Sequence, residues 1–218
     1  WKYDPVTDTA SQVADINTGS GDSYPSNLVV YDDELYFVAD DGSTGHELWK
    51  YDATTSTASQ VADSLPGSAA AYPNYLTIGQ DKLWLENSNT TYDEALFYVD
   101  STGLHFFKSF TDTNEDSHPT HFVQLNGVLY FQADDGITGT ELWKYDPVTD
   151  TASQAADIVS GSGASNPKYL VVYDGAVYFQ ADNGITGTEL WKYDPVNDTA
   201  SQVADINTGS GERDPEDL

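Results

Sequence analysis

The feature that most constrains the fold is an internal repeat of about 48 residues. The string WKYD begins at Trp1, Trp49, Trp143 and Trp191, with Phe97 at the missing position. A second column keeps the same register with Pro25, Pro73, Pro119, Pro167 and Pro215. The chain therefore divides into the units 1–48, 49–96, 97–142 and 143–190, followed by the partial unit 191–218. A repeat of this length is a single supersecondary unit that buries its apolar face by stacking on its neighbours.

Each unit predicts four short β-strands. In one unit the strand-like runs are Tyr169–Tyr173, Ala176–Ala181, Glu189–Asp194 and Ala200–Ile206. They are rich in the β-branched and aromatic residues that suit a pleated surface. Asp174-Gly175 predicts a tight hairpin turn between the first two runs, and no segment has a sustained helical period. Four strands per repeat predict an all-β fold, a β-propeller of four to five four-stranded blades.

The third strand of the repeat carries a family resemblance. The segments Glu47–Asp52, Glu141–Asp146 and Glu189–Asp194 resemble the ELWxxD repeats of large, secreted, hyalin-like bacterial and cyanobacterial proteins. The resemblance covers nearly the whole chain, and the repeat length is similar to that of kelch-like blades. The hairpin Ala133–Trp143 more loosely resembles the Asp-box hairpins of sialidase-type propellers, with a longer spacing from Gly to Trp. The resemblance implies an extracellular multi-repeat propeller protein and says little about activity.

The point in the repeat at which the chain begins and ends does not decide whether the blades close into a ring. The chain begins in a third strand, and its last residues, Asp217-Leu218, align with Asn27-Leu28 at the start of a first strand. We therefore expect four first-and-second-strand hairpins and five third-and-fourth-strand hairpins. The surplus half-blade fits a four-bladed ring with a spare hairpin, a five-bladed ring completed by another molecule, or an array that does not close. An unclosed ring leaves edge strands that pair with other chains.

Residues 1–21 match residues 191–211 at 20 of 21 positions, the exception being Thr7 against Asn197. The neighbouring unit, 143–163, matches residues 1–21 at 18 of 21 positions. This supports the hypothesis of a 190-residue super-repeat, four blades long, in a chain of tandem propellers. Recent shuffling of single units is the alternative. In either case we expect the chain to be part of a longer repeat array.

Charge excludes several classes of partner. The chain has 36 Asp and Glu against 8 Lys and Arg, a formal net charge of −28. Nucleic-acid binding needs a basic surface, so no nucleic-acid partner is expected. No apolar stretch approaches the length of a membrane-spanning helix, so membrane insertion is not expected. The absence of Cys excludes disulfides and thiol catalysis, and together with the charge it favours a salt-rich extracellular or cell-surface setting.

Acidic residues recur at matched positions of the second hairpin. They are Asp40, Asp41 and Glu47 in one unit, Asp134, Asp135 and Glu141 in another, and Asp182, Asn183 and Glu189 in a third. Carboxylates around a bent, Gly-bearing loop suit Ca²⁺, which takes several oxygen ligands, so calcium is a candidate cofactor. The alternative is that Asp and Asn cap the turn while Glu lies on a solvated strand. The second unit departs from the pattern, since Asn87–Glu94 has no Gly and different acids.

The residue before each column proline varies and is the best candidate for ligand binding. The four candidates are Tyr24, Tyr72, His118 and Asn166. The loop they occupy feeds the first strand, which lines the channel of a propeller, and loops on a rigid scaffold usually carry recognition. Ordinary loop variation is the alternative. The tryptophans and tyrosines of the WKYD column are interpreted as inter-blade packing rather than sugar-stacking platforms, because they recur in every blade.

His118 and His121, beside Glu115 and Asp116, offer Zn²⁺-type ligands, but Pro119 interrupts the segment and other units lack the pair. We therefore interpret this segment as a solvated loop. Enzyme signatures such as G-x-S-x-G, a P-loop or H-E-x-x-H are absent from the sequence.

The sequence predicts a non-catalytic extracellular structural or adhesion protein. We expect it to be calcium-stabilised and to associate with itself, as a polymer, filament or tandem array, through unpaired half-blades. The alternative is a carbohydrate-binding lectin that binds glycans at the blade-entry loops. A propeller hydrolase is a third hypothesis.

Overall fold

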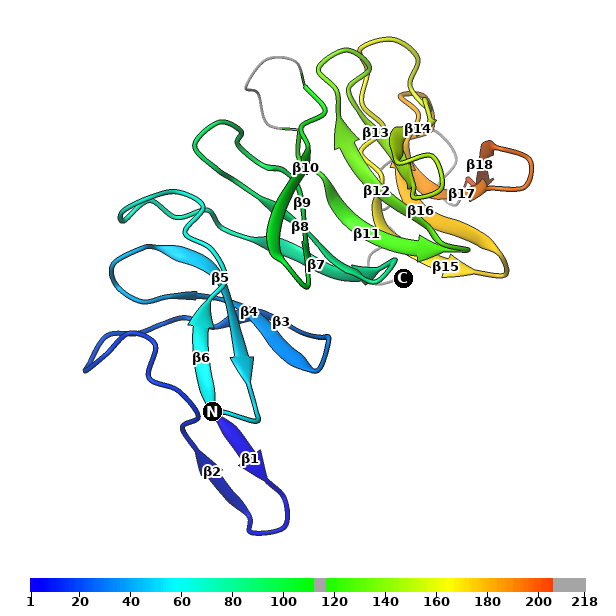
Figure 1. The fold of residues 1–218 in the computed structure, drawn as a ribbon. Helices are drawn as coiled ribbons and strands as arrows, with labels where there is room; N and C mark the ends of the chain where they lie inside the picture. Colours follow the sequence, from blue (N-terminus) through cyan, green and yellow to red (C-terminus); the bar gives the residue numbers. More distant parts are fainter. Residues whose placement is uncertain (112–116, 206–218) are drawn as a thin grey trace.

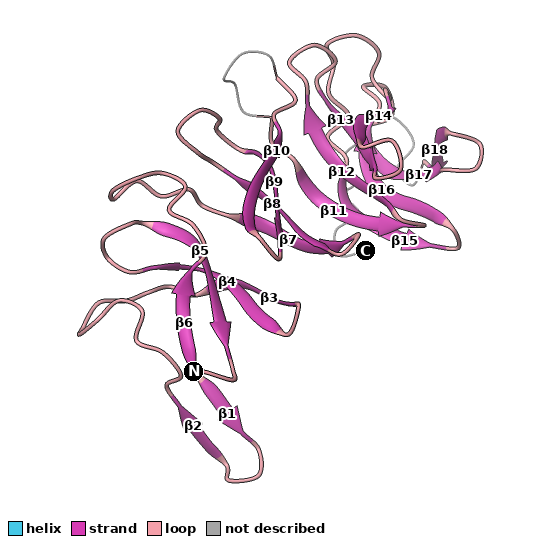
Figure 2. Ribbon diagram, viewed as in Figure 1, coloured by secondary structure: helices cyan, strands magenta, loops and turns pink. Residues whose placement is uncertain are grey.

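Four antiparallel sheets and one isolated hairpin make up the chain. The computed structural model describes residues 1–111 and 117–205, all of them in strands, turns or loops (Figure 2). The isolated hairpin consists of β1 (Lys2–Asp4) and β2 (Thr9–Ser11). Since the described residues contain no helix, none of them forms a helix able to cross a membrane.

Each sheet is a four-stranded meander, which we call a blade. Blade 1 contains β3 (Ser26–Tyr31), β4 (Glu34–Asp40), β5 (His46–Asp52) and β6 (Thr57–Gln60). Blade 2 contains β7 (Asn74–Gly79), β8 (Lys82–Asn87), β9 (Ala95–Asp100) and β10 (Gly103–Lys108). Blade 3 contains β11 (Thr120–Leu125), β12 (Val128–Asp134), β13 (Thr140–Asp146) and β14 (Thr151–Ala156). Blade 4 contains β15 (Lys168–Tyr173), β16 (Ala176–Asp182), β17 (Thr188–Asp194) and β18 (Thr199–Ala204).

The blades are arranged as in a β-propeller. Their first strands lie innermost, because β3 packs beside β7, β7 beside β11, and β11 beside β15. Figure 1 shows the four sheets fanned along an arc, with the β1–β2 hairpin at one end and blade 4 at the other. The predicted all-β propeller fold is confirmed, as are the four first-and-second-strand hairpins and the five third-and-fourth-strand hairpins.

Local turn chemistry explains the first hairpin of each blade. Two residues with positive φ connect its strands, and this geometry matches the twist of a two-residue hairpin. The pairs are Asp32-Asp33, Gln80-Asp81, Asn126-Gly127 and Asp174-Gly175. Only the last two carry the Gly that makes such a turn evident in a sequence.

The repeat units counted from each Trp cut every sheet within its third strand, so the structural blades are shifted relative to those units.

Apolar side chains fill the space between neighbouring blades. We call the side of a blade that faces the preceding blade its leading face, and the side that faces the next blade its trailing face. On blade 3 the leading face presents Phe131 and Trp143, which pack with Trp84 and Leu96 of the trailing face of blade 2. The same residue positions meet at the other two junctions. The interpretation of the repeated aromatics as inter-blade packing is therefore confirmed for blades 3 and 4, whereas Trp49 and Tyr51 pack within blade 1 and against Ile16.

Candidate functional site

The loops that lead into the innermost strands gather the predicted ligand-binding residues at one end of the propeller. Tyr24, Tyr72, His118 and Asn166 all have left-handed backbone, with φ between 42° and 48°. Such a conformation costs a residue other than Gly about 1–2 kcal/mol. Its recurrence in all four blades shows that the scaffold imposes it. The structure therefore brings the four predicted residues to equivalent positions at the entry to the innermost strands.

Two of these residues form an aromatic group with a neighbour. Tyr24 and Tyr72 are 63% and 67% exposed. Their rings stack with His46 at centroid distances of 6.2 and 5.4 Å. Exposed rings of this kind offer flat apolar surface beside polar groups. Asn166 differs, because its side-chain amide donates a hydrogen bond to the carbonyl of Ala164 at 3.5 Å.

A second column of residues was missed from the sequence. Asn27, Tyr75, His121 and Tyr169 stand two positions after each column proline, and all have positive φ. Each lies where the register between the first and second strands shifts, as in a β-bulge. They form a row across the innermost strands: the rings of Tyr75 and His121 lie 5.2 Å apart, and those of His121 and Tyr169 6.0 Å apart. The fixed offset from the proline was the sequence signal for this column.

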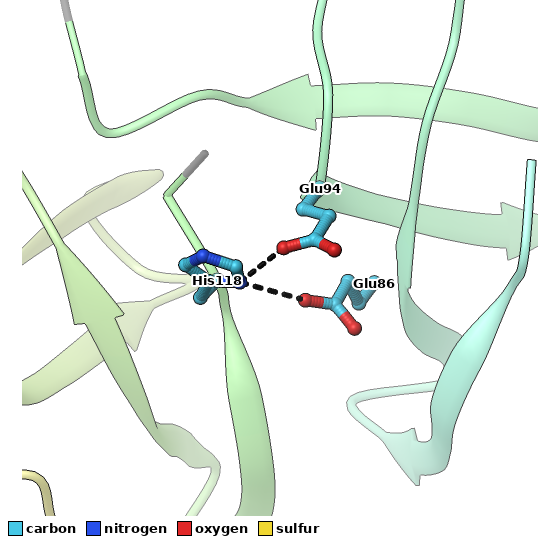
Figure 3. A group of neighbouring side chains, drawn as sticks. All are labelled: Glu86, Glu94 and His118. Carbon is cyan, nitrogen blue, oxygen red and sulfur yellow. Dashed lines mark ion pairs between the residues drawn. The ribbon is translucent and has the colours of Figure 1, made fainter. Parts of the chain in front are cut away.

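A cluster of three ligating side chains spans the junction of blades 2 and 3. Glu86 lies on β8, Glu94 immediately precedes β9, and His118 lies in the loop that leads into β11. One ligand atom of each lies within 4.8 Å of the other two. Figure 3 shows the two carboxylates pointing toward the imidazole from the neighbouring blade. His118 Nδ1 contacts Glu94 and lies 4.0 Å from Glu86 Oε1.

Burial makes this cluster electrostatically unusual. The side chain of Glu86 is only 9% exposed, whereas those of Glu94 and His118 are 40% and 50% exposed. Burial, followed by the charges of Glu86 and Glu94, raises the pKa of the Tyr75 hydroxyl nearby. Burial and the charge of Lys168 lower the pKa of His121. The two glutamates therefore influence the titration of a neighbouring hydroxyl group.

His118 and His121, which the sequence analysis considered as a zinc pair and set aside in favour of a solvated loop, belong to different groups in the structure. Within residues 1–111 and 117–205, His118 groups with Glu86 and Glu94, and no group of potential metal ligands includes His121. His121 instead lies beside Tyr75 and Tyr169. Glu115 and Asp116, the acids beside these histidines in the sequence, lie outside the described residues. Neither glutamate was identified from the sequence, because both are distant from His118 along the chain.

The repeated acidic loops act as turn caps. Asp41 Oδ1 accepts hydrogen bonds from the backbone N–H groups of Ser43 and Thr44, each at 2.8 Å. Asp135 and Asn183 accept equivalent bonds in blades 3 and 4. Asp40, Asp134 and Asp182 each accept one bond from the N–H group of the glycine two residues later. The capping alternative is confirmed for these residues, and blade 2 uses Asn89 in the same way.

The repeated glutamates have a separate role. Glu47, Glu141 and Glu189 are buried, at 0%, 0% and 1% exposure, so the expectation of a solvated strand is wrong. Glu47 accepts hydrogen bonds from the N–H groups of Ser64 and Ala71, in the segment that connects β6 with β7. Glu141 binds Ile158, Val159 and Ser165 in the next connection. Glu47 and Glu141 therefore hold the connection from blade 1 to blade 2 and that from blade 3 to blade 4 from inside.

The structure does not bring the predicted three-acid calcium sets together. Among the described residues, neither Asp40, Asp41 and Glu47 nor the corresponding acids of blade 3 form a group of convergent ligands. Burial raises the pKa of Glu47 to about 7 and also raises that of Glu141. Calcium binding stays a prediction, and these loops offer it no preformed set of three acids.

Comparisons with known proteins agree on the fold. The chain is similar to a puromycin hydrolase structure (S511A mutant complexed with PGG), with a TM-score of 0.59 and 17% identity over 89% of this chain and 30% of that one. It is also similar to a Mycobacterium tuberculosis puromycin-hydrolyzing peptidase, with a TM-score of 0.59 and 13% identity over 84% of this chain and 29% of that one. TolB from Acinetobacter baumannii gives a TM-score of 0.53 and 13% identity over 81% of this chain and 43% of that one.

The chain belongs to the β-propeller fold class. At these identities the likeness shows the fold alone, and the chain spans less than half of each of these structures. No protein-family model and no curated protein sequence matches it.

Proposed function

We propose that this propeller is a non-catalytic structural module that joins further blades of its own kind, in the extracellular or cell-surface assemblies that its repeat resemblance and charge suggest. The observation that carries the proposal is that, within the residues that the structure describes, complementary blade faces are only partly covered at the two ends of the arc. Its partner is a second copy of the chain, bound head to tail. The proposal does not require calcium, and the experiment below tests whether calcium changes the assembly.

Among residues 1–111 and 117–205, no further blade covers the trailing face of blade 4. Tyr178 stands where Tyr36 and Tyr130 stand in blades 1 and 3, and those two are only 4% and 2% exposed because the next blade covers them. Tyr178 and Leu190 are only partly buried. Covering such side chains contributes about 1.5–3 kcal/mol each. The open trailing face therefore carries the residue types that hold the internal junctions together.

The leading face of blade 1 is the complementary surface. Leu35 and Tyr51 are partly buried, whereas their equivalents in blade 4, Val177 and Tyr193, are fully buried. A groove of about 710 Å³ runs along this face and is lined by both of these residues, by Phe37 and by Trp1 of the β1–β2 hairpin. Trp1 is 83% exposed, although its repeat equivalents are buried. One open face of each type makes a heterologous, head-to-tail contact that builds rings or filaments.

Light scattering coupled to size exclusion tests the proposal, with calcium and then with chelator. We expect the apparent mass to rise from 23.8 kDa with protein concentration. Tyr178→Asp on the trailing face should keep the chain monomeric. Val196→Asp adds the same charge on an exposed loop of blade 4 and should assemble as the parent chain does. A monomer at every concentration, or equal assembly of the two variants, contradicts the proposal.

Glycan binding at the loops that lead into the innermost strands is a second candidate function. The exposed rings of Tyr24 and Tyr72 on either side of His46 favour it. A glycan array with the parent chain, followed by calorimetry on any sugar bound, tests this function. Tyr72→Ala should remove binding, whereas Tyr173→Ala, which removes a ring of similar exposure elsewhere, should retain it. An array without signal, or binding by the Tyr72 variant, excludes this function.

A further inference from the structure

We propose that Glu86, Glu94 and His118 form a site for one divalent transition-metal ion at the junction of blades 2 and 3. The inference does not depend on the assembly proposal. It rests on the convergence of the three side chains, on the burial of one of them, and on their restriction to a single junction of a repetitive scaffold.

The geometry supplies three ligands from two blades. One nitrogen and two carboxylate oxygens lie within 4.8 Å of one another (Figure 3). Zinc-type ions bind such atoms at about 2.0–2.2 Å, so the three atoms must close around the ion by modest side-chain rotation. The side chains of Glu94 and His118 are 40% and 50% exposed, whereas Glu86 on β8 is 9% exposed. The site therefore combines one buried ligand with two partly exposed ligands.

The ligand set selects the class of metal. Ca²⁺ and Mg²⁺ favour sites made of oxygen atoms, whereas an imidazole with carboxylates suits Zn²⁺, Co²⁺ and Ni²⁺. Three protein ligands leave a further position for water or a small ligand.

The buried charge also favours a cation. Glu86 places a carboxylate in a poorly solvated position beside a second carboxylate, in a chain whose net charge is −28. Two close carboxylates repel each other, and a bound divalent ion offsets that repulsion.

The other junctions act as internal controls. In the register of the sheets, Glu86 corresponds to Val38 and Gln132, and Glu94 corresponds to His46 and Thr140. The positions equivalent to His118 hold Tyr72 and Asn166. The junction of blades 1 and 2 thus carries an aromatic stack, and that of blades 3 and 4 carries neutral polar residues. A purely structural role would require no such set of ionisable residues, because the same scaffold forms twice without it.

Metal-binding calorimetry on the full chain, stripped with chelator and titrated with Zn²⁺ near neutral pH, tests the proposal. We expect one equivalent to bind, with Ca²⁺ binding far more weakly. His118→Asn and Glu94→Gln should each weaken Zn²⁺ binding by more than about tenfold. Both residues are exposed enough for the variants to fold. Glu86→Gln should act similarly, with circular dichroism used to confirm its fold.

The matched control is His46→Asn, which removes a histidine at the neighbouring junction and should leave the Zn²⁺ affinity unchanged. Co²⁺ provides a spectroscopic readout, because its visible absorption bands should appear on binding to the parent chain and be lost in the His118 variant. Absence of a stoichiometric Zn²⁺ site, or equal affinity in the His118 and Glu94 variants and the parent chain, overturns the proposal. Neither the Zn²⁺ affinity nor the Co²⁺ absorption measures self-association, so a negative result for the metal site does not contradict the assembly proposal.

Discussion

Replacing the buried Glu47 by Gln should remove a loss of folding stability that the parent chain undergoes as the pH rises. The carboxylate is fully buried and fastens the connection between blades through the N–H groups of Ser64 and Ala71. Burial, only partly offset by these hydrogen bonds, raises its pKa from 4.5 to about 7. A raised pKa means that the folded chain binds a proton which the unfolded chain has already lost. The free energy of unfolding therefore falls as pH rises from 4.5 to 7.

The magnitude follows from the size of the pKa shift. One pKa unit corresponds to 1.36 kcal/mol, so a rise from 4.5 to about 7 corresponds to about 3 kcal/mol of stability lost over that pH window. Gln resembles the protonated carboxyl group and does not titrate. The stability of Glu47→Gln relative to the parent chain should therefore rise by about 3 kcal/mol between pH 4.5 and pH 8. The amide nitrogen of Gln cannot accept a hydrogen bond, so either the Ser64 or the Ala71 N–H group loses its bond to this side chain. That loss lowers the variant by about 1–3 kcal/mol at every pH and leaves the pH-dependent difference intact.

Urea unfolding followed by tryptophan fluorescence measures the effect at several pH values. The slope with urea must stay the same in both chains, so that a change in midpoint reports stability. Asp33→Asn is the matched control, because it removes one exposed carboxylate from the same blade at a turn position that Asn tolerates. It should show no comparable gain with pH. If the Glu47 variant and the parent chain keep a constant stability difference from pH 4.5 to 8, the reasoning about the buried carboxylate is wrong.

Three further predictions concern packing, capping and charge. Tyr130→Ala should destabilise the monomer by about 3–5 kcal/mol, whereas Tyr178→Ala, at the same position on the open trailing face, should cost less than half as much in urea unfolding. Asp135→Asn should leave the melting temperature nearly unchanged, because Asn183 makes the same bonds in blade 4, whereas Asp135→Ala should cost about 1 kcal/mol. Raising NaCl to 1 M should increase the melting temperature, because a net charge of −28 repels itself and salt screens that repulsion; a lower melting temperature would contradict this.

The fold was predictable because the repeat encodes it several times. Strands expected at Ala176–Ala181 and Glu189–Asp194 appear as β16 (Ala176–Asp182) and β17 (Thr188–Asp194). The alternation of apolar and polar residues and the turn residues are local signals. Because the unit is repeated, a signal that is missing in one unit is present in another. The turn at Asp32-Asp33 was less evident, because its positive φ values are imposed on residues other than Gly.

The role of the repeated glutamates could not be predicted from local pattern. Glu47 lies near Asp40 and Asp41 in sequence, which suggested one shared site. Adjacent strand positions point to opposite faces, and the carboxylate reaches instead the backbone of the connection to the next blade, 17 to 24 residues later. Such a contact depends on the path of a loop, which the composition of that loop does not specify.

The candidate metal cluster could not be predicted from the sequence for a different reason. Its members come from three segments and two blades, so only the stacking of blades brings them together. A repeat protein nevertheless offers a way to search for such sites without knowledge of its relatives. Each junction has the same backbone, so an ionisable residue that replaces an apolar or neutral one at a single junction is not required by the fold. Glu86 in place of Val38 and Gln132 is such a residue, and it is buried, where an unneeded charge is costly. Departures of this kind, mapped onto the junction they share, separate the residues that build the propeller from those that give one junction its own chemistry.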